Sequence, residues 1–329
     1  MKRISVVAAF LAVLAALGAG PGRAESSERE ALVLGVAENA GDIPTFIALE
    51  KGFFRDEGLD VTTRSWTAGK LALEAMFRHE VDVATVADTP IVLQSFKRRD
   101  FVVIATFSHN NPYRLVADRM DGILAPDDLR GRRVGVMKGT TSQYFLYSVL
   151  ADRGIAPTEI TEVDVPAEDS AEALVNHRVD AIAAFDPHGY YAEVALGARA
   201  VVMPYERARH EETFNFVVPR DFSARRPVAV QRLLRATRRA IEWSQGHRAE
   251  AIALAARRLK IDETVLETLW GNYRHVLSLD QVLIASVEAQ ARWAIRNGLA
   301  EGAAVPNYLD FLDTAPLDAV LPAAVTIIR

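Results

Sequence analysis

Polar residues gather at three places where a predicted strand ends and a helix begins. The three runs are Trp66-Thr67-Ala68-Gly69-Lys70, Asp88-Thr89-Pro90 and Lys138-Gly139-Thr140-Thr141-Ser142. The unpaired backbone N–H groups and the dipole at a helix N-terminus attract negative charge. Ser, Thr and Asp also cap helices in any protein, so one such run by itself indicates only a cap. Three runs that converge on one point would bind a small anion.

A sequence repeat places these runs in two halves of the chain. The segment from His79 to Pro90 returns as the segment from His177 to His188, with the same offset of 98 residues for three pairs: His79 and His177, Asp82 and Asp180, Asp88 and Asp186. A predicted helix precedes each copy. The repeat predicts two related α/β lobes, and ligands are usually held in the cleft between such lobes. Asp186 could cap the following helix or accept a hydrogen bond from a ligand.

The elements that position these residues alternate between strand and helix, which is typical of a parallel sheet covered on both faces. The expected strands are 32–36, 59–64, 81–86, 101–106, 114–117, 133–137, 161–165 and 214–218, and the expected helices include 44–51, 68–78, 90–97, 142–153 and 279–297. We expect two similar Rossmann-like lobes joined by a hinge of two strands, 114–117 and 214–218. The first lobe would comprise 29–116 and 217–329, with its helical C-terminal part packed on it, and the second lobe 117–216.

The N-terminal segment has the pattern of a secretory signal peptide. Lys2 and Arg3 precede an apolar run that ends near Leu17, and small residues lead to a predicted cleavage site after Ala24. The apolar run is shorter than the ~20 residues that span a bilayer. The chain has no cysteine, so it has no lipid-modified cysteine anchor and no disulfide. We therefore expect residues 1–24 to be removed and the mature protein to be exported.

Composition and motifs argue against several other functions. The formal charge of −5 disfavours binding to nucleic acid. The seven histidines show no HExxH spacing, and no glycine-rich phosphate loop of the Walker type is present. The sequence thus predicts no metal, no cofactor and no catalytic centre. An enzyme that acts on a small acid with the same architecture remains an alternative.

Several motifs resemble the solute-binding proteins of nitrate, taurine and aliphatic sulfonate ABC importers. They are Leu49–Phe54, Glu57–Leu59, Ala75–Asp82, Lys138–Thr141, Phe185–His188 and Gln290–Ile295. The resemblance implies a periplasmic binding protein of the type II fold. Such a protein closes its lobes on a solute and delivers it to an inner-membrane permease with a cytoplasmic ATPase.

The resemblance also implies a pocket. With Gly139 added from the third run, the predicted ligand-binding residues are Glu38, Asn39, Asp42, Gly69, Asp88, Thr89, Gly139, Thr140, Thr141, Ser142 and Asp186. The chain departs from the family in having Phe185 where many relatives carry Trp, and in its acidic first loop. These carboxylates disfavour a bare inorganic anion such as nitrate. We expect a monomer that binds a sulfonate-like or taurine-like anion or zwitterion. A pyrimidine-like, neutral or cationic solute is the alternative ligand, and a sensor that signals to a membrane receptor is an alternative role.

Overall fold

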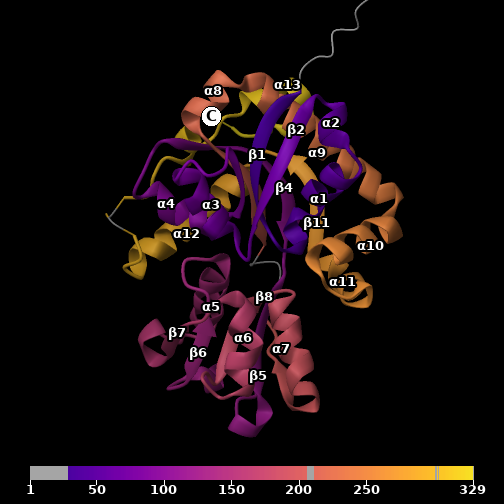
Figure 1. The fold of residues 1–329 in the computed structure, drawn as a ribbon. Coiled ribbons are helices and arrows are strands. Elements are labelled where there is room, and N and C mark those ends of the chain that lie inside the picture. The colour runs from indigo at the N-terminus through magenta and orange to yellow at the C-terminus, as the bar shows by residue number, and fades with distance from the viewer. Residues whose placement is uncertain (1–28, 206–210, 301, 303, 329) are drawn as a thin grey trace, which may run out of the picture.

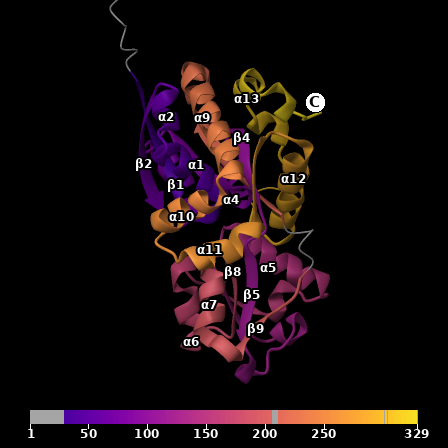
Figure 2. The same ribbon diagram turned by 90° about the vertical axis from the view of Figure 1, so that its right-hand side faces the viewer.

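The computed structural model describes residues 29–205, 211–300, 302 and 304–328, which form two lobes, each built on one β-sheet (Figures 1 and 2). The predicted signal peptide lies outside these residues. Within the described ranges, no helix is both long and apolar enough to cross a membrane.

The first lobe contains a sheet of six strands in the order β11-β4-β10-β3-β1-β2. The strands are β1 (Glu30–Ala37), β2 (Leu59–Trp66), β3 (Val83–Ala87), β4 (Phe101–Asn110), β10 (Glu212–Pro219) and β11 (Tyr273–Ser278). β1 is parallel to β2 and β3, but β10 is antiparallel to β3 and β4. The expected all-parallel sheet is therefore mixed, because β10 returns from the second lobe and enters the sheet in the opposite direction.

The second lobe repeats this arrangement in a sheet of five strands, β7-β6-β8-β5-β9. The strands are β5 (Tyr113–Asp118), β6 (Arg133–Val136), β7 (Thr161–Asp164), β8 (Ala181–Phe185) and β9 (Ala200–Val202). β6 is parallel to β7 and β8, whereas β5 is antiparallel to β8 and β9. In each lobe one of the three parallel strands, β3 or β8, lies in the repeated segment.

The chain changes sheet between β4 and β5, through Asn111 and Pro112, and again between β9 and β10. The lobe boundaries expected at 116/117 and 216/217 fall inside β5 and β10. Hydrophobic patterns showed that both segments are strands, but they did not show which sheet each strand joins. β5 belongs entirely to the second sheet and β10 entirely to the first.

Helices cover the faces of both sheets, as expected. The first lobe carries α1 (Ile43–Glu50), α2 (Phe53–Asp56), α3 (Gly69–Phe77), α4 (Asp88–Ser95), α8 (Arg220–Arg225), α9 (Pro227–Gly246), α10 (Arg248–Leu259), α11 (Glu263–Leu269), α12 (Gln281–Arg296) and α13 (Ala315–Val320); the second carries α5 (Thr141–Asp152), α6 (Ser170–Val175) and α7 (His188–Leu196). α9 packs on α1, and α12 packs on α4. The C-terminal helices thus share the core of the first lobe, which confirms that prediction.

The sequence repeat is also a repeat of structure. His79 and His177 follow α3 and α6 and both have a positive φ, 60° and 52°. The Asp82 carboxylate accepts a hydrogen bond from the backbone N of Val33 at 2.7 Å, and the Asp180 carboxylate accepts one from the backbone N of Arg133 at 2.7 Å. In each lobe the repeated aspartate therefore connects the start of one strand, β3 or β8, to the neighbouring parallel strand, β1 or β6.

We expect Asp82→Ala to lower the free energy of unfolding by about 1–2 kcal/mol, because it leaves the Val33 N–H without its acceptor. Urea denaturation followed by circular dichroism measures this change. Asp60→Ala, at an exposed position on β2, is the control and should change stability by less than about 0.5 kcal/mol. Equal effects of the two substitutions would contradict the proposed role of Asp82.

Candidate functional site

A pocket of about 440 Å³, counting the space at its mouth, lies between the lobes. Both lobes contribute to its wall, which consists of Asn39, Ala68, Gly69, Lys70, Ala87, Pro90, Pro112, Tyr113, Thr140, Thr141, Ser142, Phe185, Asp186, Glu212, Phe214 and Tyr273. A cleft between two lobes is a common place for a ligand.

Two helices from opposite lobes begin at this pocket. α3 has Ala68 as its N-cap residue and α5 has Thr140, and no side-chain hydrogen bond caps either helix. The Thr140 hydroxyl donates instead to the carbonyl of Met137 at 2.7 Å. The first backbone N–H groups of a helix have no partner within the helix. Both helix ends can therefore donate hydrogen bonds to an anion.

Two side chains, those of Ser142 and Lys70, provide further hydrogen-bond donors near these helix ends. The Ser142 hydroxyl is buried and has no hydrogen-bond partner among the residues described. The Lys70 ammonium crosses the cleft and donates to the carbonyl of Lys138 at 3.0 Å. Gly139 lies outside the pocket wall, but a Cβ there would be 3.1 Å from the Lys70 Nζ. The absence of a side chain at this position therefore leaves room for Lys70, and the φ of +74° is one that residues other than glycine rarely adopt.

Gly69 allows α3 to begin directly against the end of β3. A Cβ at this position would lie 2.8 Å from both the carbonyl oxygen of Thr85 and the Cα of Val86. Backbone atoms cannot move aside as a flexible side chain can, so only glycine fits here. The close approach brings the first turn of α3 into the pocket wall.

The pocket wall also contains acidic side chains. The Glu212 carboxyl accepts hydrogen bonds from the Tyr113 hydroxyl and from Nδ2 of Asn110, the latter at 3.2 Å. Burial, with the nearby Asp88, raises the pKa of Glu212 to about 8, so it is mostly protonated at neutral pH. Asp186 is paired with Arg114, whose Nε is 2.7 Å from its Oδ1. Neither carboxyl thus presents an uncompensated charge to the pocket.

Asp88 and Thr89 lie behind the pocket wall. The fully buried Asp88 carboxylate accepts hydrogen bonds from the backbone N of Thr89 at 2.9 Å and from the Thr141 hydroxyl of the other lobe at 3.3 Å. The Thr89 hydroxyl donates to Gln290 on α12 at 2.5 Å. Because Asp88 itself accepts from this helix end, the junction of β3 and α4 contributes Ala87 and Pro90 to the wall and does not form a third anion site.

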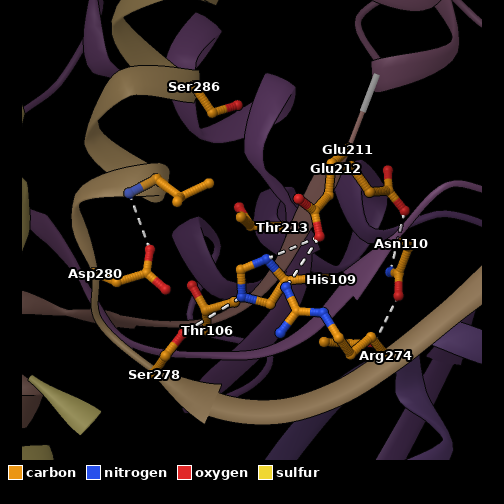
Figure 3. A network of polar contacts seen from close by, with 12 residues as sticks. Thr106, His109, Asn110, Glu211, Glu212, Thr213, Arg274, Ser278, Asp280 and Ser286 are labelled. Carbon is orange, nitrogen blue, oxygen red and sulfur yellow. Dashed lines mark hydrogen bonds and ion pairs between the residues drawn. The ribbon is translucent and has the colours of Figure 1, made fainter. Parts of the chain in front are cut away.

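A polar network on β4, β10 and β11 lies beside the hinge (Figure 3). Nε2 of His109 is 3.4 Å from the Ser278 hydroxyl, and its Nδ1 is 3.5 Å from Glu211, which also accepts from Arg274 at 3.0 Å. Burial lowers the pKa of His109, so the ring is neutral at pH 7. In the described part of the chain, no group of three or more His, Asp or Glu residues could hold a metal ion.

Comparison with known sequences identifies the family. The family model described as NMT1/THI5 like matches residues 39–251, which span most of both lobes and more than half of the chain. The chain belongs to the NMT1/THI5-like family.

Relatives and solved structures agree with this family. A binding protein of Brucella abortus (strain 2308) is 24% identical over 300 residues, which cover 89% of this chain and 90% of the relative. The alkanesulfonate-binding protein SsuA from Xanthomonas axonopodis pv. citri, solved with MOPS, superposes with a TM-score of 0.74 at 19% identity over 91% of this chain and 98% of that one. DszB, a desulfurization enzyme solved with biphenyl-2-sulfinic acid, gives 0.70 at 17% identity, over 90% and 99%. These matches confirm the predicted periplasmic binding protein fold.

The pocket of this NMT1/THI5-like protein includes six of the eleven predicted ligand residues: Asn39, Gly69, Thr140, Thr141, Ser142 and Asp186. Glu38 is exposed to solvent away from the pocket wall. Asp42 is fully buried inside the first lobe, where it accepts from the backbone N of Ala37 at 2.8 Å and from the Thr85 hydroxyl at 2.6 Å. Burial raises the pKa of Asp42 to about 7. Asp42 therefore forms hydrogen bonds inside the first lobe, and the acidic residues of the pocket come from elsewhere.

Sequence reasoning missed the residues that reach the pocket from the hinge. Tyr113 and Glu212 are the first residues of β5 and β10, so each directly follows a change of sheet. Both residues lie next to strands that the sequence predicted to form the hinge, and this position is the signal that could have identified them. Tyr273 begins β11, which was not predicted as a strand.

The raised pKa of Glu212 predicts a pH-dependent contribution to stability. Between its ordinary value of 4.5 and about 8, the unfolded state loses this proton while the folded state keeps it, so the free energy of unfolding falls as pH rises. We expect Glu212→Gln to reduce this fall between pH 5 and pH 8 in urea denaturation. The exposed Glu50→Gln serves as the control. The same pH slope in Glu212→Gln and the unsubstituted protein would contradict the assignment.

Proposed function

We propose that this protein is the periplasmic solute-binding component of an ABC importer and that it binds a small organic anion or zwitterion by closure of its lobes. One observation carries the proposal: α3 and α5, from opposite lobes, begin at the same pocket without capping side chains, next to Lys70. Hydrogen bonds to a charged group contribute about 1.5–3 kcal/mol each, and micromolar affinity requires only about −8 kcal/mol. A few backbone donors therefore suffice.

The mixture of groups in the pocket wall favours a bifunctional solute. An anionic group such as a sulfonate would accept hydrogen bonds from the ends of α3 and α5, near Ser142 and Lys70. An amine, hydroxyl or amide of the same solute would contact Glu212 and Tyr113, with the Phe214 ring against its apolar part. A neutral ring such as a pyrimidine, bound by Glu212 and Tyr113, is the alternative.

The relatives support import rather than another role. The names of the matched proteins include binding proteins and periplasmic sulfonate-binding proteins of ABC transporters. By analogy, the solute would be passed to an inner-membrane permease with its ATPase. The predicted signal peptide and these neighbours both support a periplasmic location. We also propose that the protein acts as a monomer.

Catalysis on the same fold is the second hypothesis, because DszB is an enzyme. The DszB complex was obtained with a cysteine-to-serine variant, whereas this chain contains no cysteine. A cysteine nucleophile is therefore excluded here. Glu212, whose pKa is raised to about 8, is the pocket group that could exchange a proton in such a reaction, whereas Asp186 is paired with Arg114.

A thermal-shift screen of the chain beginning at Glu25 tests the proposal. The compounds are taurine, MOPS, ethanesulfonate, nitrate, amino acids and pyrimidines. A solute at ten times its dissociation constant adds ~1.4 kcal/mol of stability, which appears as a clear rise in melting temperature. We expect an organic anion or zwitterion to stabilise the protein more than nitrate does. Stabilisation by neutral or cationic compounds alone would refute the anion site.

Ser142→Ala separates ligand binding from stability. Since the Ser142 hydroxyl forms no hydrogen bond within the described structure, its loss should change the free energy of unfolding by less than about 0.5 kcal/mol. The loss should weaken binding of the best solute from the screen about ten-fold, as measured by calorimetry. Ser148→Ala, on the same helix, removes only a hydroxyl that donates to the carbonyl of Tyr144 and should leave affinity unchanged. Equal affinities of both variants would argue against Ser142 as a ligand residue.

A further inference from the structure

One face of α12 presents three side chains, Ser286, Gln290 and Trp293, to the junction between the lobes. The spacing of four and three residues places them on the same face of the helix. The Ser286 hydroxyl donates to the Asp88 carboxylate at 3.0 Å, and Gln290 accepts from Thr89 at 2.5 Å. The first two side chains therefore attach α12 to the beginning of α4, within the first lobe.

The third side chain, Trp293, reaches the second lobe. Its ring centroid lies 5.2 Å from that of Tyr144 and 5.6 Å from that of Tyr147, with interplanar angles of 72° and 84°. Both tyrosines are on α5, and Figure 2 shows α12 directly above α5. Trp293 is only 4% exposed. Edge-to-face pairs of this kind stabilise a contact beyond the burial of area alone. Opening of the cleft would break both pairs.

Trp293 contacts α5, which is one of the two helices that begin at the pocket. Tyr144 lies one turn after Thr141, which lines the pocket and donates to Asp88 at 3.3 Å. The Trp293 ring itself is not part of the pocket wall. Its contact with α5 therefore fixes where the N-terminus of α5 lies without any contact between Trp293 and the solute.

We propose that Trp293 is a positioning residue that keeps a substantial fraction of the molecules closed before any solute binds. Hydrogen bonds between the lobes also favour the closed form. Lys70 donates to the carbonyl of Lys138 at 3.0 Å, and Asn272 donates to Asp186 at 3.2 Å. A solute that binds only the closed form has an apparent dissociation constant that rises as the closed fraction falls. Trp293 thus raises affinity from outside the pocket. Only this last consequence rests on the proposed binding function.

Small-angle scattering of the chain beginning at Glu25, without added solute, tests the closed state. We expect the unsubstituted protein to scatter as the closed form and Trp293→Leu to show a larger radius of gyration. Trp243→Leu is the matched control, because Trp243 stacks on His247 within the first lobe, with ring centroids 4.7 Å apart. A second variant, Tyr144→Leu with Tyr147→Leu, removes the contact from the other side and should open the protein as well. An open unsubstituted protein, or closed variants, would overturn the proposal.

Binding of MOPS, measured by calorimetry, tests the effect on affinity. We expect Trp293→Leu to raise the dissociation constant about ten-fold, in line with the loss of two aromatic pairs, and Trp243→Leu to leave it unchanged. Unchanged affinity in Trp293→Leu would overturn the positioning role. Failure of the unsubstituted protein to bind MOPS would count against a sulfonate ligand, whereas the scattering result would still decide the closed state.

Discussion

The buried carboxylate of Asp88 connects the elements that surround the cleft. It accepts hydrogen bonds from Thr89 on α4, from Thr141 on α5 of the other lobe, from the backbone N of Thr213 on β10 and from Ser286 on α12. Burial raises its pKa, which shows how unfavourable the charged form would be without these donors. Since a buried carboxyl is tolerated only when it is hydrogen-bonded, the four elements must keep their relative positions in the closed protein.

The fold was largely predictable because its signals are local and repeated. The 98-residue offset showed two lobes, and the apolar runs of β1, β3 and β4 are typical of buried strands. The pairing of strands was not predictable. β10 pairs with β4, about 110 residues earlier in the chain, and β11 pairs with the same strand from about 165 residues away. Such long-range pairing depends on the return of the chain through the hinge, and no local pattern contains that information.

The site was predictable to the extent that each residue belongs to a strand-to-helix junction. Gly69 lines the pocket because only glycine fits against the end of β3, and Thr140 lines it as the N-cap residue of α5. Asp42 has the composition of a ligand residue, but its carboxylate turns inward to Thr85, and sequence does not determine such an orientation. Glu212 and Tyr113 meet only because both changes of sheet occur at the same place. The missing information was therefore tertiary.

The duplicated aspartates, Asp88 and Asp186, occupy equivalent strand ends on the two sides of the cleft and have been stabilised in different ways. Asp88 accepts hydrogen bonds from hydroxyl and backbone amide donors in the described part of the chain, whereas Asp186 is paired with the cationic Arg114. The first lobe thus satisfies its repeated aspartate with neutral donors, and the second lobe does so with a cation from its own sheet, since Arg114 lies on β5. Substitution of Arg114 alone would therefore change the net charge of the second wall, whereas these partners of Asp88 carry no charge that could be lost.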